Sequence, residues 1–413
     1  MSGYFQTLNP ASILSRPWPY PYKGGLAISN DVEFMSFEYF ELLMEFLNTE
    51  NETLLGKGLG INVTSSFFFY SANQYNFCFS DGIGNKLKKK PYSSRIEEYL
   101  QSGWIDTIHA YGDFDGVGGF QRELAQAYYE AMEELGVTIE VFTNHGSSDN
   151  VQNVGTDAGY HKGDQRNNIA YHADLMKLNG IRYIWTDSMV VEKNIPTKKS
   201  QAKKYIRKYI NYIKGIHERS NSRLTFSETL QDGNEFRGFT RFRSTGLNAP
   251  NLSSLGAQLD QIDWDSFYHS AGGLIIYQHL GVLYRAARQC IKASVDGIKS
   301  RPEIFLRPFY QLEKEVKEGR LWMEGLAWFL NYVEMVESTQ IIKHDNGVYE
   351  LMGDTNGKTA ASYFQGLTIY TNPNNPIILK YKNQKINFIY NGPDSSGQYS
   401  VTVPFGKKPK IWP

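Results

Sequence analysis

The chain has 413 residues, of which 41% are hydrophobic and 14% aromatic, enough to bury one large core and a smaller one, so two domains are expected. The 43 basic and 43 acidic residues balance, which argues against nucleic acid or an anionic membrane surface as a partner and favours a neutral ligand such as a carbohydrate. Cys78 and Cys290 are the sole cysteines, no leader peptide is evident and no apolar run approaches about 18 residues, so the sequence predicts a cytoplasmic protein with reduced thiols and no membrane span. The oligomeric state stays open.

From about residue 24 to residue 293, apolar segments typical of strands alternate with amphipathic segments typical of helices. This alternation predicts an α/β fold with a parallel sheet. The predicted strands are 25–29, 58–64, 107–110, 138–143, 182–185, 223–226 and 273–277. The predicted helices are 37–47, 120–135, 171–178, 199–218, 282–293 and 321–336. Seven strands is one fewer than in the common barrel, and the basic run from Lys198 to Lys214 is interpreted as a solvated helix face.

After the last predicted helix the sequence no longer alternates between strand and helix patterns. Short strands are predicted at 348–352, 364–370, 376–381, 385–390 and 399–403, separated by Asn, Gly, Pro and Asp turns. The predicted organisation is therefore a β/α barrel over residues 1–336 and an accessory β-sandwich domain over residues 337–413.

The first predicted strand ends in two acidic groups. Residues 26–33 read Leu-Ala-Ile-Ser-Asn-Asp-Val-Glu, so Asp31 and Glu33 follow an apolar run directly. In barrel folds the carboxyl ends of the strands carry the chemistry. These two carboxylates are therefore candidates for a metal ligand and a catalytic base.

A second strand delivers a histidine and a further carboxylate. His109 ends the predicted strand 107–110, and Asp113 follows four residues later, a spacing that places both side chains on one face of a helical turn. An imidazole and a carboxylate together with a carboxylate from the first strand make a three-ligand site with an open position, suited to Zn²⁺ or a similar divalent ion.

With these segments the chain resembles the polysaccharide deacetylase superfamily, whose fold is a deformed barrel of about seven parallel strands and whose members remove acetyl groups from sugars with a divalent metal. In that family a first strand ending in Asp-x-Asp supplies base and ligand, which here implies Asp31 as base and Glu33 as ligand. The family's His-x-x-x-His ligand pair matches His109 and Asp113, with a carboxylate in the second place. The resemblance also implies that His279, after the late strand Gly-Leu-Ile-Ile-Tyr-Gln, is the general acid.

Two departures from the family pattern matter. In an alternative alignment Asn30-Asp31 replaces the family's Asp-Asp, which leaves Asp31 as a metal ligand and removes the base. The family's Arg-Pro motif, which orients the base, is not recognisable. The closest resemblance is to deacetylase-like proteins of surface-polysaccharide biosynthesis, which share the Asn-Asp-x-acid start, the His-x-Tyr-Gly-Asp-Phe segment and an Asn-His-Gly turn.

Candidate substrate-binding residues come from segments near these strand ends. The stretch 144–174 is dense in polar groups, as expected of a long loop that shapes a barrel pocket, and it contains Asn144, His145 and His172. His145 follows the fourth strand and is placed to donate to a substrate oxygen. Arg122 either pairs with a carboxylate such as Asp31 or is solvated, and Trp185 either floors a sugar ring or packs in the core.

The predicted function is metal-dependent removal of acetyl groups from N-acetylated sugars of a surface polysaccharide or its precursor. In this scheme Asp31 takes a proton from the attacking water, an ion (Zn²⁺ by preference) stabilises the developing oxyanion, and His279 protonates the leaving amine. Two alternatives remain: a catalytically silent carbohydrate-binding relative, and a glycoside hydrolase on the same barrel, in which two carboxylates bracket the scissile bond.

Overall fold

The computed structural model describes residues 5–81, 88–146, 148–155, 159–190, 219–221, 223–243, 249–286, 289–355 and 357–406. The predicted helix 199–218 and the whole basic run from Lys198 to Lys214 lie outside these residues. Among the described residues, no helix has the length and apolar character needed to cross a membrane.

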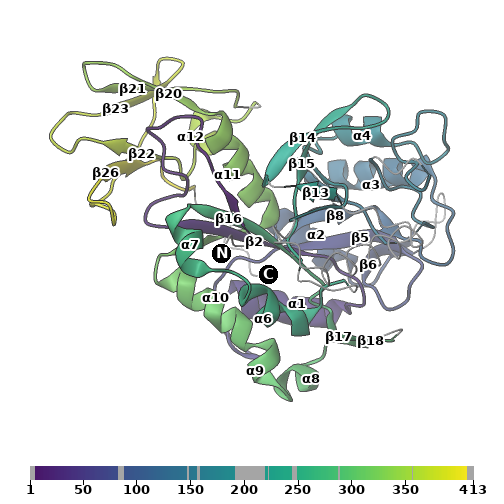
Figure 1. Cartoon of the computed structure of the whole chain (residues 1–413). Coiled ribbons are helices and arrows are strands. Elements are labelled where there is room, and N and C mark those ends of the chain that lie inside the picture. The colour runs from purple at the N-terminus through teal and green to yellow at the C-terminus, as the bar shows by residue number, and fades with distance from the viewer. Residues whose placement is uncertain are drawn as a thin grey trace, which may run out of the picture.

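The fold is mixed α/β and is built on one large curled sheet (Figure 1). The main path of the sheet runs in the order β1 (Gln6–Thr7), β16 (Gly272–Gln278), β2 (Gly24–Asn30), β5 (Ser65–Ser71), β8 (Ile105–His109), β10 (Val141–Thr143), β11 (Tyr183–Trp185), β15 (Glu235–Phe239) and β14 (Thr225–Thr229). The neighbours from β16 to β15 pair in parallel, and β1 and β14 pair antiparallel at the two edges. This ladder is a half-barrel, so a closed (β/α)7 barrel is not confirmed.

The segment that follows β15 returns to the other end of the sheet. Phe242 forms a parallel bridge with Ile276 of β16, because its N–H donates to Ile275 O at 2.7 Å and its carbonyl accepts from Tyr277 N at 2.8 Å. The preceding residue, Arg241, donates its N–H to Ser188 O at 3.0 Å. These contacts bring Arg241 beside the carboxyl ends of β16 and β2.

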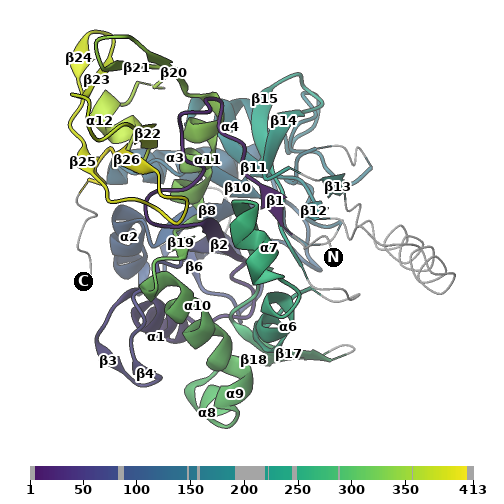
Figure 2. The same ribbon diagram turned by 60° about the vertical axis from the view of Figure 1, so that its left-hand side comes forward.

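Helices and short strands surround the sheet (Figures 1 and 2). The helices up to the C-terminal sheets are α1 (Phe37–Asn48), α2 (Ser93–Ser102), α3 (Arg122–Leu135), α4 (Ala173–Leu178), η2 (Leu252–Ser254), α6 (Leu255–Leu259), α7 (Trp264–His269), α8 (Val295–Lys299), α9 (Pro302–Phe305), α10 (Arg307–Lys317) and α11 (Leu326–Ser338). The additional strands are β3 (Glu52–Thr53), β4 (Gly56–Lys57), β6 (Cys78–Asp81), β7 (Lys88–Lys89), β9 (Gly112–Asp113), β12 (Ser188–Val190), β13 (Arg219–Asn221), β17 (Val282–Ala286), β18 (Gln289–Lys292) and β19 (Leu321–Met323).

The central strands β2 and β16 are buried along their whole length, as their continuous apolar sequences predict for a parallel sheet covered on both faces. Gly25 is required in β2, because a Cβ there would lie 2.3 Å from the ring of Trp18. Helix α1 starts where Ser36 caps the N–H of Tyr39, and it buries Phe40, Leu43 and Leu47 on one face. The predictions of helices near 37–47 and 120–135 are confirmed.

Two predicted elements are wrong, and two are correct only in part: the predicted helix 321–336 begins with the strand β19, and the predicted strand 385–390 is two short strands in different sheets. The stretch 58–64 alternates apolar residues, but Gly60 and Asn62 adopt positive φ of 66° and 53°, which breaks an extended strand. The strand begins directly after this stretch and is β5, at Ser65–Ser71. The predicted helix 282–293 is instead a hairpin of β17 and β18, paired antiparallel.

The chain ends in two small sheets. One has the order β20 (Gln340–Lys343), β21 (Val348–Met352), β23 (Ile378–Tyr381) and β24 (Gln384–Lys385), and the other has the order β22 (Thr368–Thr371), β26 (Tyr399–Thr402) and β25 (Ile389–Tyr390), with the one-turn helix α12 (Ala360–Tyr363) between β21 and β22. Their apolar residues belong to the cluster that contains α11 and Trp18. An N-terminal segment joins them, since Ser15 forms an antiparallel bridge with Ile369.

Candidate metal centre

Four segments of the chain bring acidic and imidazole groups together beyond the carboxyl ends of parallel strands. Asp31 and Glu33 follow β2, His109 ends β8, His145 follows β10 and His279 follows β16. All five side chains are buried, with between 1% and 8% of each residue exposed. The positive φ of Phe34, 58°, turns the chain sharply after Glu33, and the Phe34 N–H donates to Asn76 Oδ1 at 2.7 Å.

One carboxylate oxygen lies at the middle of the imidazoles. Glu33 Oε1 is 3.2 Å from His145 Nδ1, 3.4 Å from His109 Nε2 and 3.3 Å from His279 Nε2. His145 Nδ1 and His109 Nε2 are 3.2 Å apart. Ligand atoms that lie about 2.0–2.1 Å from a tetrahedral Zn²⁺ are roughly 3.3 Å from one another, so the triangle of Glu33, His109 and His145 has the size of one face of such a site.

The outer nitrogens of His109 and His145 are bonded to acceptors. His109 Nδ1 lies 2.8 Å from Thr143 Oγ1 and 3.3 Å from the Thr143 carbonyl. His145 Nε2 donates to Asp113 Oδ1 at 3.1 Å. Such outer partners fix the tautomer of a metal-ligating histidine and leave the other nitrogen unprotonated, with its lone pair toward the ion.

His279 follows the same arrangement. Its Nδ1 donates to the Pro250 carbonyl at 2.7 Å, so in the neutral ring the lone pair of Nε2 faces Glu33. Two of the carboxylate oxygens, Asp31 Oδ2 and Glu33 Oε2, are buried and accept no hydrogen bond from the part of the chain that the structure describes. Lone pairs that converge in a buried space repel one another unless a cation lies between them.

In the protein without an ion, the imidazoles and carboxylates of the cluster share protons, which shifts two of their pKa values. Burial alone would raise the pKa of Glu33, but nearby His279 and His109 and hydrogen bonds from His109 and His145 hold it well below its usual value. Burial alone would lower the pKa of His145, but the hydrogen bonds to Asp113 and Glu33 raise it well above its usual value. A divalent ion would take the place of the proton that these groups attract, as is general when imidazoles and carboxylates become ligands.

Asp31 is held by an arginine that the sequence analysis missed. Arg241 is fully buried, and its Nη1 donates to Asp31 Oδ1 at 2.8 Å and to Ser29 Oγ at 3.0 Å. Its guanidinium carbon lies 3.4 Å from the ring centroid of Trp185 and 3.8 Å from that of Tyr277. No local pattern marks Arg241, which follows β15 after Thr240, and its contact with Asp31 spans 210 residues of sequence.

The three polar residues at the end of β2 make different contacts. Asn30 donates to Ser65 Oγ at 2.8 Å and accepts from Leu280 N at 2.8 Å, so its side chain joins neighbouring segments. Glu33 lies among the imidazoles, and Asp31 lies beside them with Oδ2 3.7 Å from His109 Nε2. Glu33 is thus the carboxylate that contacts all three imidazoles, and Asp31 is the carboxylate held by Arg241.

Asp113 lies on the far side of His145 from Glu33. The helical turn expected after His109 does not form, because Ala110 and Tyr111 have positive φ of 50° and 62° and Asp113 belongs to the short strand β9. Asp113 also accepts from Asn76 Nδ2 at 2.8 Å. His145, rather than Asp113, therefore lies beside Glu33 and His109, and Asp113 accepts a hydrogen bond from the outer nitrogen of His145.

The other predicted substrate-binding residues lie away from the imidazoles or are engaged elsewhere. Arg122 does not pair with Asp31; it donates to Asp174 at 2.6 and 2.8 Å. Asn144 bonds the backbone of Val154. The ring of Trp185 packs against the guanidinium of Arg241, and its Nε1 donates to Ser188 O at 2.8 Å. The ring therefore contacts Arg241 and is not free to pack on a sugar.

His172 is a structural histidine and gives a testable prediction. Its Nε2 donates to Gln152 O at 2.7 Å, and burial lowers its pKa to about 4. The unfolded chain binds this proton near pH 6.5, so the stability due to the neutral ring is complete above that pH and is lost as the pH falls toward 4. Relative to His172→Gln, the free energy of unfolding of the wild type should fall by about 3 kcal/mol between pH 7 and pH 4. Urea unfolding at both pH values measures it, and parallel losses in the two proteins would contradict it.

The arrangement can hold one divalent ion between two imidazoles and a carboxylate, with a second carboxylate and a third imidazole beside it. Asp113, Asp115 and His145 form another group of possible ligands on the outer side of the His145 ring. That second group uses the nitrogen already bonded to Asp113, so the inner group is the better candidate. No protein-family model, curated protein or solved structure matches the chain, so its function has to be argued from this site.

Proposed function

We propose that the protein is a metal-dependent hydrolase that removes acetyl groups from N-acetylated sugars of a surface polysaccharide or its precursor, on a distorted form of the (β/α)7 deacetylase barrel. The observation that carries the proposal is the convergence of three imidazole nitrogens on Glu33 Oε1 at 3.2–3.4 Å, with each outer nitrogen bonded. The choice of a carbohydrate as the substrate rests on the resemblance of the three strand ends to those of polysaccharide deacetylases.

Glu33, His109 and His145 would hold the ion. Two buried imidazoles and a carboxylate, with further positions open, are the donor set of catalytic zinc sites. When bound, the ion lowers the pKa of a water ligand toward neutrality and polarises the substrate carbonyl. Asp113 supports the ion indirectly, because its hydrogen bond keeps the Nδ1 lone pair of His145 directed inward.

Asp31 is placed to act as the general base. Arg241 holds one carboxylate oxygen, Oδ1, and leaves Oδ2 without a hydrogen-bond partner among the described residues, 3.7 Å from His109 Nε2. A carboxylate fixed by one oxygen keeps the other oriented to accept a proton from the attacking water. The rings of Trp185 and Tyr277 both contact the guanidinium of Arg241 and restrict it, so the carboxylate has little freedom to turn away.

His279 is placed to protonate the leaving amine. Its Nδ1 is bound to the Pro250 carbonyl, so Nε2 is the nitrogen that gives up the catalytic proton, and it lies 3.3 Å from Glu33 Oε1 and 3.5 Å from the Tyr277 hydroxyl. His279 also belongs to a group of possible ligands with Asp31 and Glu33. His279→Ala separates the two roles, because loss of an acid leaves the metal content unchanged and loss of a ligand lowers it.

The two alternatives receive no specific support. A glycoside hydrolase needs two carboxylates that bracket one bond, whereas Asp31 and Glu33 belong to one centre with three imidazoles. A silent relative was favoured by an Asn at the place of the base, whereas Asn30 bonds Ser65 and Leu280 instead.

The test is to measure metal and turnover on one sample. The purified protein is expected to carry about one divalent ion per chain, and to release acetate from at least one member of a panel of free, nucleotide-linked and polymeric N-acetylated sugars. Chelation should stop the release, and added Zn²⁺ should restore it. Absence of bound metal after incubation with Zn²⁺ would refute the metal centre, and metal without acetate release would leave a binding protein.

A further inference from the structure

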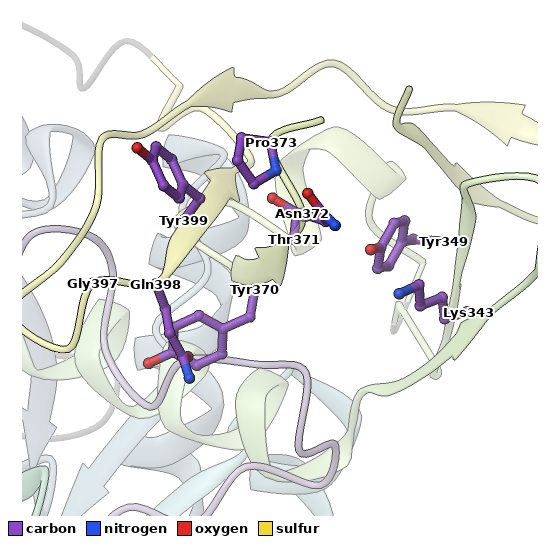
Figure 3. Close-up of a pocket in the computed structure, with 9 residues that line it drawn as sticks. All are labelled: Lys343, Tyr349, Tyr370, Thr371, Asn372, Pro373, Gly397, Gln398 and Tyr399. Carbon is purple, nitrogen blue, oxygen red and sulfur yellow. The ribbon is translucent and has the colours of Figure 1, made fainter. Parts of the chain in front are cut away.

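The two C-terminal sheets border a cavity that the proposed chemistry does not use. It has a volume of about 390 Å³ and opens to solvent (Figure 3). Its lining residues are Lys343, Tyr349, Tyr370, Thr371, Asn372, Pro373, Gly397, Gln398 and Tyr399. The volume is within the range of small-molecule sites, about 300–1,000 Å³.

Both sheets contribute aromatic side chains to this cavity. Lys343 of β20 and Tyr349 of β21 are paired across one sheet, and the Lys343 Nζ lies 5.8 Å from the centroid of the Tyr349 ring. Tyr370 of β22 and Tyr399 of β26 come from the other sheet, as Figure 3 shows. Because Tyr399 is paired with Thr371, Tyr370 and Tyr399 project from opposite faces at the end of that strand pair.

The polar groups of the lining remain available to a ligand. Tyr399 is 39% exposed and Tyr370 is partly exposed, so both rings reach solvent, whereas Tyr349 is a core residue with 3% of its surface exposed and forms the floor of the cavity. The amide of Gln398 is exposed at the same rim. Asn372 also lies there, with its carbonyl oxygen accepting from Asn374 N.

We propose that this cavity is a saccharide-binding site that holds the carbohydrate chain outside the metal centre. Sugar rings present apolar faces that pack on aromatic rings and hydroxyls that pair with amides and phenols, and the lining offers the accessible rings of Tyr370 and Tyr399, two amides and a threonine. Lys343 is the one charged group among the lining residues, which disfavours a multiply charged phosphate ligand. The existence of the site rests on this geometry, and the choice of an N-acetylated saccharide rests on the proposed function.

The experiment measures binding of defined oligosaccharides to the full chain by calorimetry. The probes are tetrasaccharides of N-acetylglucosamine and of N-acetylgalactosamine, and of their de-N-acetylated forms. Tyr399→Ala and Tyr370→Ala are each expected to weaken binding of the best probe about tenfold or more, as for truncation of an aromatic anchor. Tyr399 is 39% exposed, so its substitution should leave the fold intact.

Tyr390→Ala is the matched control, because Tyr390 is a 62% exposed tyrosine on β25 of the same sheet and does not line the cavity. Equal affinity in all of these proteins, or no binding of any probe by the wild type, would overturn the site and leave the metal centre to stand on acetate release. Tyr399-dependent binding that persists in Glu33→Gln supports a separate site. The same binding without acetate release from the wild type would keep the site and refute the hydrolase.

Discussion

His145→Ala is expected to lose the bound divalent ion, with an affinity at least 100-fold below that of the wild type. The inner nitrogen of His145 forms two edges of the ligand triangle, at 3.2 Å from Glu33 Oε1 and 3.2 Å from His109 Nε2. Loss of an outer partner of a ligand costs about 10–100-fold in affinity, so loss of the ligand itself should cost more. Metal analysis after dialysis against a buffered Zn²⁺ solution measures the effect, and His109→Ala should behave in the same way.

Two further variants sharpen this prediction. Asp113→Asn should lower the affinity by about 10–100-fold and still bind at saturating Zn²⁺, because Asp113 contacts the outer nitrogen of His145. His344→Ala is the control, since His344 lies on the C-terminal part of the chain and pairs with Glu350. Wild-type metal content in both His145→Ala and His109→Ala would refute the centre, and complete loss in Asp113→Asn alone would move the ligand role to Asp113.

The second large effect is expected for Asp31→Asn, which should lower the rate of acetate release by about two to four orders of magnitude while the ion is retained. Asparagine keeps the shape of the side chain and an oxygen for the Arg241 hydrogen bond, but it cannot take a proton. Glu33→Gln should show the opposite combination, because Glu33 lies among the imidazoles and Asp31 lies beside them. Acetate release and metal content, measured on the same preparations, give both quantities.

The pair of variants also discriminates between the two alignments of the first strand end. If Asp31→Asn loses the ion and Glu33→Gln keeps it, Asp31 is the ligand and the site lacks the proposed base. Circular dichroism at matched concentration checks that both proteins are folded. Unchanged acetate release in Asp31→Asn would exclude it as the base under either alignment.

The parts of the fold that follow from local pattern were predictable. β2 and β16 are continuous apolar runs, and α1 and α3 carry an apolar face at helical spacing, so their positions agree with the predictions within a few residues. The strand β5 was predicted too early, at 58–64, because the apolar residues there alternate as in a strand. The positive φ of Asn62 prevents an extended backbone at that place. The hairpin of β17 and β18 was taken for a helix because its short apolar segments fit both periods.

The site was predictable where a residue directly follows an apolar strand, as with Glu33, His109 and His279. Its completion depends on contacts between distant segments, which no local pattern encodes. His145 was recognised as a residue near the site, but its place beside Glu33 and His109 was not, because the left-handed turn at Ala110 and Tyr111 that carries Asp113 to the outer side of its ring has no local sequence signal. Arg241 was missed because its partner Asp31 is 210 residues away.

The parallel pairing of β16 with β2 also sets when the centre can form during synthesis. Glu33 and His279 are 246 residues apart, and β16 lies between β2 and the bridge at Phe242, so a nascent chain that ends before β16 has neither the third imidazole nor the strand that supports Asp31. Chains grow at about 5–20 residues per second, so Glu33 and His109 are outside the ribosome for roughly ten seconds or longer before the pocket around them is complete. Under the proposed function, an ion would therefore bind only after β16 has joined β2, late in the formation of the fold.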